Sequence, residues 1–239
     1  MAKVFQVDTD GTLTTNLRAY YQFQTNSNDF TDNARNGVDT NTPTYTAGKV
    51  SNALTCVAAS SQYISIPNAA IAWGTPVISI NFWFKLAATD ANMALAPMTG
   101  TTGKGLLIYY AGGVLTFSKP NVADCNYTWA GKDTNWHMLT CVGRSNGNDM
   151  ETYLDGTSVA TNQASLNFVN PYGVTLTIGE FKWGGLLQAG WYLGGQIDEL
   201  GFWDKSLSTQ EIADLYNSGN GQTMIEPITR GAAFLLNFL

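Results

Sequence analysis

Aromatic side chains in two polar stretches of the sequence have the clearest capacity to bind a ligand. They are Tyr127 and Trp129, within the polar segment 126–133, and Trp183, Trp191 and Tyr192, which flank Gly184, Gly185 and Gly190. Flat aromatic faces complement the apolar C–H faces of sugars, and they are also enriched in protein interfaces. We therefore predict a ligand-binding role for these five residues. The alternative is that they seal the open end of the folded domain.

Catalytic chemistry is less well supported by the titratable residues. Asp198 and Glu199 are adjacent, so on a strand they point to opposite faces, whereas a retaining glycosidase needs two carboxylates about 5 Å apart. His137, the only histidine, follows Trp136 in an apolar run without a nearby Ser or Cys nucleophile motif. A structural histidine is favoured there over a general base. We predict a protein that is not an enzyme, with a glycan-cleaving enzyme as the least favoured alternative.

The charge balance limits the partners of the chain. Its 239 residues include 12 Lys and Arg against 18 Asp and Glu, a net charge of −6. So few basic residues argue against nucleic-acid binding, which needs an electropositive surface for phosphates. The sequence also lacks the run of about 18 apolar residues that a membrane-spanning helix requires.

The N-terminus and the cysteines indicate where the chain folds. Residues 1–8 show neither an apolar signal core nor a small-residue cleavage site, which predicts synthesis without export. Cys56, Cys125 and Cys141 are an odd number, so they do not form a complete disulfide framework. We expect buried free thiols and folding in a reducing cytoplasm.

Alternating apolar and polar residues predict strands as the elements that carry the candidate residues. Charged residues make up 13% of the chain, about half the usual share. Alternation is visible over 17–24, 78–86, 115–117 and 174–178, while 136–142 is apolar on both faces, as in a central strand. Asp155-Gly156 predicts a hairpin between 151–154 and 157–161. These signals favour an all-β, two-sheet antiparallel sandwich.

One short helix is expected late in the chain. Ser208 and Glu211 have the spacing of a capping box, and 217–219 provides the stop. We expect this helix to lie as a lid across one edge of the sandwich. We assign residues 17–221 to one domain, 1–16 to an N-terminal arm and 222–239 to an apolar C-terminal arm that favours burial.

A set of short motifs, in order along the chain, carries a resemblance to a known family. They are LRAYYQF (17–23), DNARNG (32–37), AL (53–54), YISIP (63–67), INFWF (80–84), WH (136–137), YLDG (153–156), GQIDEL (195–200) and LSTQEIADLY (207–216). The sequence resembles laminin-G-like, concanavalin-A-like jelly-roll domains. The resemblance implies two curved antiparallel sheets, a concave face with rim loops, and carbohydrate or protein binding. The Glu-x-Asp-x-x-Glu pattern of retaining glycosidases on this fold is missing.

The resemblance also implies a structural calcium ion. Matched by motif, its donors are Asp32, the Asn36-Gly37 turn and Asp198. Calcium takes six to eight oxygen ligands. The alternative is that Asp32 caps a turn and Asp198 accepts hydrogen bonds from loop amides.

Together these points predict a binding or structural module on a bacteriophage virion, as a tail, fibre or head-decoration protein. A fold that usually works outside cells, but lacks an export signal, suits a protein made in a host cytoplasm and released by lysis. It would bind a host glycan or surface receptor, and its terminal arms would dock to neighbouring subunits in a homo-oligomer. The alternatives are a purely structural protein-interaction subunit and a cytoplasmic location.

Overall fold

Antiparallel strands dominate the structure, a computed structural model that describes residues 7–89, 93–101, 104–145, 150–163, 168, 175–183 and 186–224. Val174 and residues 225–239, which belong to a predicted strand and to the predicted C-terminal arm, lie outside these ranges. Within them the chain forms seventeen strands, one α-helix and three 3-10 turns at Ala58–Ser60, Asn68–Ala70 and Asn217–Gly219. The all-β prediction is confirmed.

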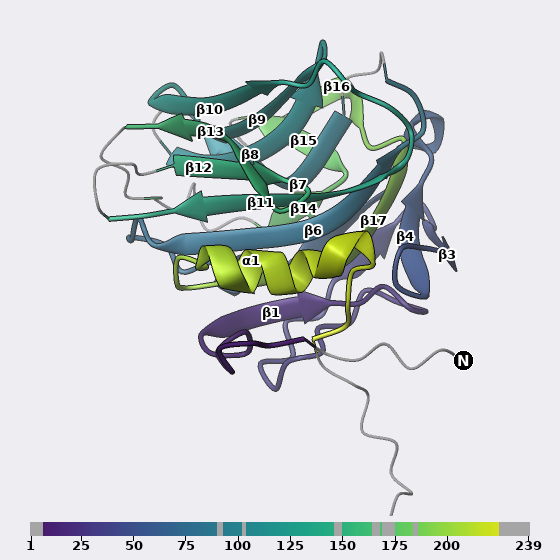
Figure 1. Cartoon of the computed structure of the whole chain (residues 1–239). Coiled ribbons are helices and arrows are strands. Elements are labelled where there is room, and N and C mark those ends of the chain that lie inside the picture. Colours follow the sequence, from purple (N-terminus) through teal and green to yellow (C-terminus); the bar gives the residue numbers. More distant parts are fainter. Residues whose placement is uncertain are drawn as a thin grey trace, which may run out of the picture.

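Eight strands form the first sheet (Figure 1). In spatial order they are β13 (Thr157–Asn162), β12 (Met150–Leu154), β11 (Trp136–Gly143), β6 (Ile78–Leu86), β17 (Gly195–Trp203), β4 (Asn52–Cys56) and β3 (Thr44–Ala47), with β1 (Leu17–Tyr21) also paired to β17. Residues 195–197 of β17 pair with β4 and residues 200–203 pair with β1. The sheet therefore forks at Asp198 and Glu199.

Six strands form the second sheet, and three more form a small third one. The second sheet runs β10 (Ala123–Thr128), β9 (Val114–Lys119), β8 (Lys104–Ala111), β7 (Met93–Thr101), β15 (Glu180–Trp183) and β16 (Leu186–Tyr192). The third runs β14 (Leu176–Ile178), β5 (Tyr63–Ile66) and β2 (Val38–Thr40). The predicted two-sheet sandwich thus has an additional small sheet that contributes to the same core.

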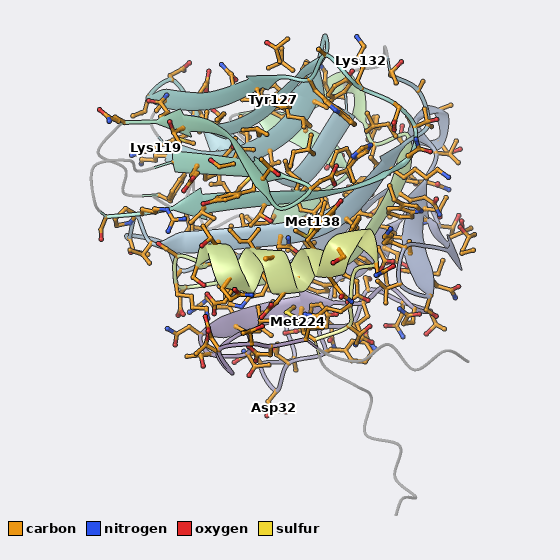
Figure 2. The ribbon with its side chains drawn as sticks, in the orientation of Figure 1. Asp32, Lys119, Tyr127, Lys132, Met138 and Met224 are labelled. Carbon is orange, nitrogen blue, oxygen red and sulfur yellow. The ribbon has the colours of Figure 1, made fainter. Side chains whose placement is uncertain are left out.

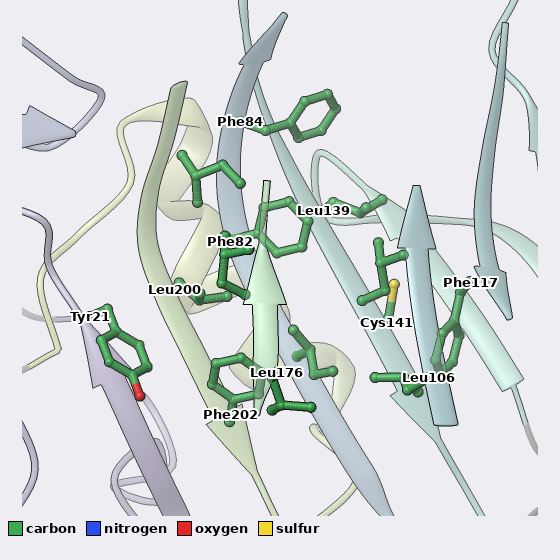
Figure 3. Close-up of a cluster of buried hydrophobic side chains, with 14 of the residues drawn as sticks. Tyr21, Phe82, Phe84, Leu106, Phe117, Leu139, Cys141, Leu176, Leu200 and Phe202 are labelled. Carbon is green, nitrogen blue, oxygen red and sulfur yellow. The ribbon is translucent and has the colours of Figure 1, made fainter. Parts of the chain in front are cut away.

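The main core lies between the sheets, where every second residue of a strand points inward. Phe82 and Phe84 on β6 and Leu139 on β11 face this layer, together with Leu106 and Phe117 from the six-stranded sheet (Figure 3). All five are at most 1% exposed. Burying one such side chain contributes about 1.5–3 kcal/mol, so the alternation seen in the sequence specifies which face of each strand is inside.

Helix α1 (Thr209–Tyr216) packs on the other face of the eight-stranded sheet and not across an edge, so the expected edge position is wrong. Its Ser208–Glu211 capping box is present. Ile212 and Leu215 join a second buried cluster with Trp83 on β6. Figure 2 shows Met138 and Met224, two further members, on either side of the helix. Because both faces of the central strands are covered, residues 136–142 are apolar on both sides.

Residues 7–16 also pack on this face, so the N-terminal arm predicted over 1–16 is corrected for this part. Thr9 donates from its backbone N–H to Oδ2 of Asp214 (2.6 Å), and the Thr12 hydroxyl donates to Glu211 (2.6 Å). Leu13 is fully buried in the second cluster, and its carbonyl accepts from the Trp203 indole (2.7 Å). These residues contact their own helix because its polar positions provide matching acceptors.

Candidate functional site

Trp191 is the predicted site residue that the structure brings into a hollow with other aromatic side chains. It lies on β16, half-buried, and its ring is 5.7 Å from the Tyr109 ring at an interplanar angle of 78°. Phe181 on β15 lies 5.3 Å from Trp191 at 42°. Leu107, 3% exposed, packs in the same small cluster. The three rings form an amphipathic platform on the solvent-facing side of the six-stranded sheet.

A depression of about 220 Å³ lies against this platform. Its described lining is Leu107, Tyr109, Ser118, Pro120, Asn121, Asp124, Phe181 and Trp191. Polar groups therefore face the rings from β9, from the β9–β10 turn and from β10. A concave site with aromatic walls and a few polar groups is the usual composition of a small-ligand site.

The alternation of strand residues explains why these side chains meet. On β8, Leu106, Ile108 and Tyr110 point into the main core, so Leu107 and Tyr109 point outward. On β10, Cys125 points inward and Asp124 outward. Asn121, with φ of 55°, lies in the tight turn that brings β10 back beside β9. The depression is thus built from outward positions of adjacent strands.

Electrostatics in the depression are set by Asp124 and Tyr109. Burial raises the pKa of the Tyr109 hydroxyl, a hydrogen bond with Thr116 opposes this effect, and the nearby Asp124 carboxylate adds a smaller increase. The hydroxyl therefore stays protonated at neutral pH and can donate a hydrogen bond. Asp124 is exposed and can accept hydrogen bonds.

Sequence reasoning missed most of this site because it looked for aromatics in loops. Tyr109, Phe181 and Asp124 lie on strands, and so does Trp191, in place of the expected glycine-rich connection. Residues 106–111 of β8 are apolar or aromatic at every position, so the sequence alone does not distinguish the outward Tyr109 from the inward Ile108 and Tyr110.

Trp129 is a core side chain. It is 5% exposed, with its ring 4.8 Å from His137, 5.9 Å from Phe84 and 6.2 Å from Tyr110. Tyr127 lies on β10 (Figure 2), half-buried against the main core. Tyr127 therefore belongs to a strand, whereas Trp129 follows the end of β10 and is buried.

The two remaining predicted aromatic residues lie on the same strands as Phe181 and Trp191. Tyr192 follows Trp191 on β16 and is half-buried, and strand alternation turns it to the opposite face. Trp183 is the last residue of β15, two positions after Phe181. Its side chain lies outside the described part of the structure.

His137 has a structural environment between two carboxylates. Its Nδ1 lies 2.7 Å from Oδ2 of Asp155, and its Nε2 lies 3.0 Å from Oδ1 of Asp133. Burial lowers the pKa of His137, but the hydrogen bonds to Asp155 and Asp133 outweigh it and raise the pKa above its ordinary value. With both ring nitrogens engaged, the histidine ties the β12–β13 turn to the segment before β11.

The four residues expected to hold calcium have separate environments. Asp32 is exposed at the tip of a loop (Figure 2), and the Asn36 side-chain oxygen accepts from the Asp29 amide (3.0 Å). Gly37 donates from its N–H to the Ser27 carbonyl (2.7 Å). Asp198 is fully buried and accepts from the Lys49 and Val50 amides (2.9 and 2.8 Å).

The predicted donors therefore do not fit a calcium shell as a set. Within the described ranges, no cluster of three or more His, Cys, Asp or Glu side chains is arranged to hold a metal ion. Asp198 Oδ1 is buried without a hydrogen-bond partner in the described structure. Calcium binding stays a prediction that rests on the resemblance.

The adjacent carboxylates of the GQIDEL motif lie inside the fold. Asp198 is 0% and Glu199 3% exposed, and Glu199 accepts a hydrogen bond from the Thr223 hydroxyl (3.2 Å). Burial raises the pKa of Asp198 to about 8, against the opposing effect of its amide hydrogen bonds. Neither group reaches a solvent-accessible substrate position.

The three cysteines are as the sequence predicted, and helix α1 is short. Cys56, Cys125 and Cys141 are free and buried, which confirms that expectation. In the ranges described, no helix has the length and apolar character needed to cross a membrane.

Solved structures with the same fold include binding domains of bacterial proteins. Domain 4 of AbnA, a GH43 extracellular arabinanase from Geobacillus stearothermophilus, in complex with arabinotriose, is 18% identical with a TM-score of 0.65, covering 83% of this chain and 97% of that one. The binding domain of Paraclostridial Mosquitocidal Protein 1 is 13% identical with a TM-score of 0.66, covering 87% of this chain and 53% of that one.

A third similar structure is the binding domain of Botulinum Neurotoxin DC in complex with SialylT. It is 15% identical with a TM-score of 0.60, covering 86% of this chain and 52% of that one. This chain therefore spans about half the length of the two toxin domains. No curated protein matches the chain.

The family is shown by a sequence model. The model Laminin_G_3, described as "Concanavalin A-like lectin/glucanases superfamily", matches residues 58–213. This range holds most of the eight-stranded sheet, the whole six-stranded sheet and the first half of α1. The chain therefore belongs to the Laminin_G_3 family of the concanavalin A-like lectin/glucanases superfamily.

Proposed function

We propose that the chain is a non-catalytic glycan-binding module whose site is the depression beside Trp191. The observation that carries the proposal is the half-exposed platform of Trp191, Tyr109 and Phe181 with polar groups facing it. Sugars need this combination, because their C–H faces pack on rings while their hydroxyls bond to polar groups. The arabinotriose complex of the arabinanase domain supports the ligand class.

The first experiment screens the purified full chain on a glycan array and then titrates the strongest hit by calorimetry. We expect Trp191→Ala to weaken binding at least about fivefold, since an aromatic contact is worth roughly 1 kcal/mol. Tyr192→Ala is the matched control, because it removes a neighbouring ring from the opposite face and should leave affinity unchanged.

Two outcomes would contradict this function. Unchanged affinity in Trp191→Ala, with a large loss of melting temperature, would make the platform a structural cluster, as in a purely structural interaction subunit. Release of reducing ends from any polysaccharide would make the protein an enzyme. The melting temperature of each variant separates lost binding from lost folding.

The biological setting is a finer proposal. We propose that the module is a virion surface protein of a bacteriophage, made in a host cytoplasm. Its three buried free thiols suit folding under reducing conditions. The same face of the domain holds both ends of the described chain, because Gln222 exchanges two hydrogen bonds with the backbone of Val7. Residues beyond both ends therefore start from one place, from which they can dock to neighbouring subunits. Immunolabelling of virions with an antibody to this chain tests the setting.

A further inference from the structure

The depression beside Trp191 has one charge in its described lining. Asp124 is the only ionisable acid or base among the lining residues other than the neutral Tyr109 phenol. The nearest lysine in sequence, Lys119, is 8% exposed and follows Ser118, so strand alternation turns it away from the depression. A ligand seated on the platform therefore meets a carboxylate that the described lining does not neutralise.

The position of Asp124 suits the recognition of hydroxyl groups. It lies at an outward position of β10, near enough to Tyr109 to raise the pKa of that hydroxyl. Its own carboxylate has no hydrogen bond recorded in the described structure, and two oxygens of a carboxylate can accept from two adjacent sugar hydroxyls. Tyr109 adds a donor, and Trp191 supplies the stacking face.

The Asp124 carboxylate repels the negative charge of an acidic sugar and so weakens its binding. A second negative charge about 4 Å away costs about 1 kcal/mol in water and more beside a protein surface. One such contact lowers affinity at least about fivefold.

We propose that the depression selects uncharged saccharides over sialylated or uronic-acid ones, and that Asp124 determines this selectivity. The inference rests on the proposed glycan-binding function and adds the chemical class of the ligand. The proposed ligand therefore differs from SialylT, with which the binding domain of Botulinum Neurotoxin DC, a domain of the same fold, has been solved.

The test uses an array that carries matched neutral and acidic glycans, such as N-acetyllactosamine and its 3′-sialylated form, and arabinotriose. Wild type, Asp124→Asn and Asp124→Lys are compared with Asp10→Asn, which makes the same charge change at an exposed position of the N-terminal segment. We expect wild type to bind the neutral glycans and to give little signal on the acidic ones. Asp124→Asn should raise the acidic-to-neutral signal ratio at least about fivefold, Asp124→Lys should raise it further, and Asp10→Asn should not change it.

The outcomes distinguish this inference from the function on which it rests. Acidic hits that Trp191→Ala abolishes would leave the glycan site in place and overturn the selectivity. An acidic-to-neutral signal ratio that is unchanged in both Asp124 variants would also overturn the selectivity, and the glycan site would stand if Trp191→Ala still removes the signal. Binding that is independent of Trp191 would instead overturn the proposed function itself.

Discussion

Asp198 accepts a hydrogen bond from the Val50 amide at 2.8 Å while its other carboxylate oxygen has no partner in the described structure. Val50 lies in the turn before β4, and Asp198 lies where β17 changes partner from β4 to β1. The carboxyl group therefore fixes the turn that feeds the fork of the sheet. The role of Asp198 is therefore structural, and its titration makes the stability of the fold depend on pH.

We expect Asp198→Asn to raise the melting temperature by several degrees at pH 8 and to have little effect at pH 4. In the unfolded chain this group ionises near pH 4, whereas burial raises its folded pKa to about 8. The folded state therefore binds the proton more tightly, and stability falls as pH rises from about 4 to 8. Asparagine keeps an acceptor for the two amides without the buried charge. A lower melting temperature at pH 8 would show that the ionised carboxylate is stabilising, as a bound cation would require.

His137 gives a second pH dependence. Its folded pKa is raised above 6.5 because the hydrogen bonds to Asp155 and Asp133 outweigh burial, so its stabilising contribution is fully present below about pH 6.5 and is lost as pH rises through the folded value. We expect His137→Gln to lower the free energy of unfolding more at pH 5.5 than at pH 9, measured by urea denaturation. Taking the difference from wild type at each pH cancels the contribution of Asp198. An equal loss at both values would contradict the ionic role of His137.

Sequence periodicity predicted several strands of the fold but not the arrangement of the site. The alternation over 78–86 and the two apolar faces of 136–142 correspond to β6 and β11, because side-chain direction in a strand follows from position alone. Trp191 was identified as a candidate, whereas Asp124 and Phe181 were not. Their meeting depends on which strands become neighbours in the six-stranded sheet, and local sequence does not specify that order.

Leu13 tests whether the N-terminal segment belongs to its own domain. Its side chain is fully buried against the second cluster, so we expect Leu13→Ala to cost about 2–5 kcal/mol of stability. For a chain of this size, that lowers the melting temperature by several degrees or more. An unchanged melting temperature with a smaller oligomer mass would show that the segment serves a neighbouring subunit instead. Light scattering and calorimetry on the same samples distinguish the two.

Truncation after Met224 tests the remaining arm. Met224 is 2% exposed, and its amide donates to the Tyr20 hydroxyl (3.1 Å), so we expect a chain ending there to keep its fold. The removed residues 225–239 include Phe234, Leu235, Leu236, Phe238 and Leu239, which favour burial in another subunit. The truncated protein should therefore show a lower oligomer mass at an unchanged melting temperature. Unfolding of the truncated monomer would place these residues in the domain's own core.

The glycan site itself is tested most directly by nuclear magnetic resonance of the tryptophan indole N–H groups during titration with the strongest array hit. Each of the seven tryptophans has one indole N–H, and Trp129 serves as an internal control because it is buried in the main core. The predicted result is a saturable shift of the Trp191 indole, together with the backbone amides of Tyr109 and Asp124, while Trp129 stays unchanged. Saturable shifts confined to other parts of the chain, with Trp191 unaffected, would contradict the site.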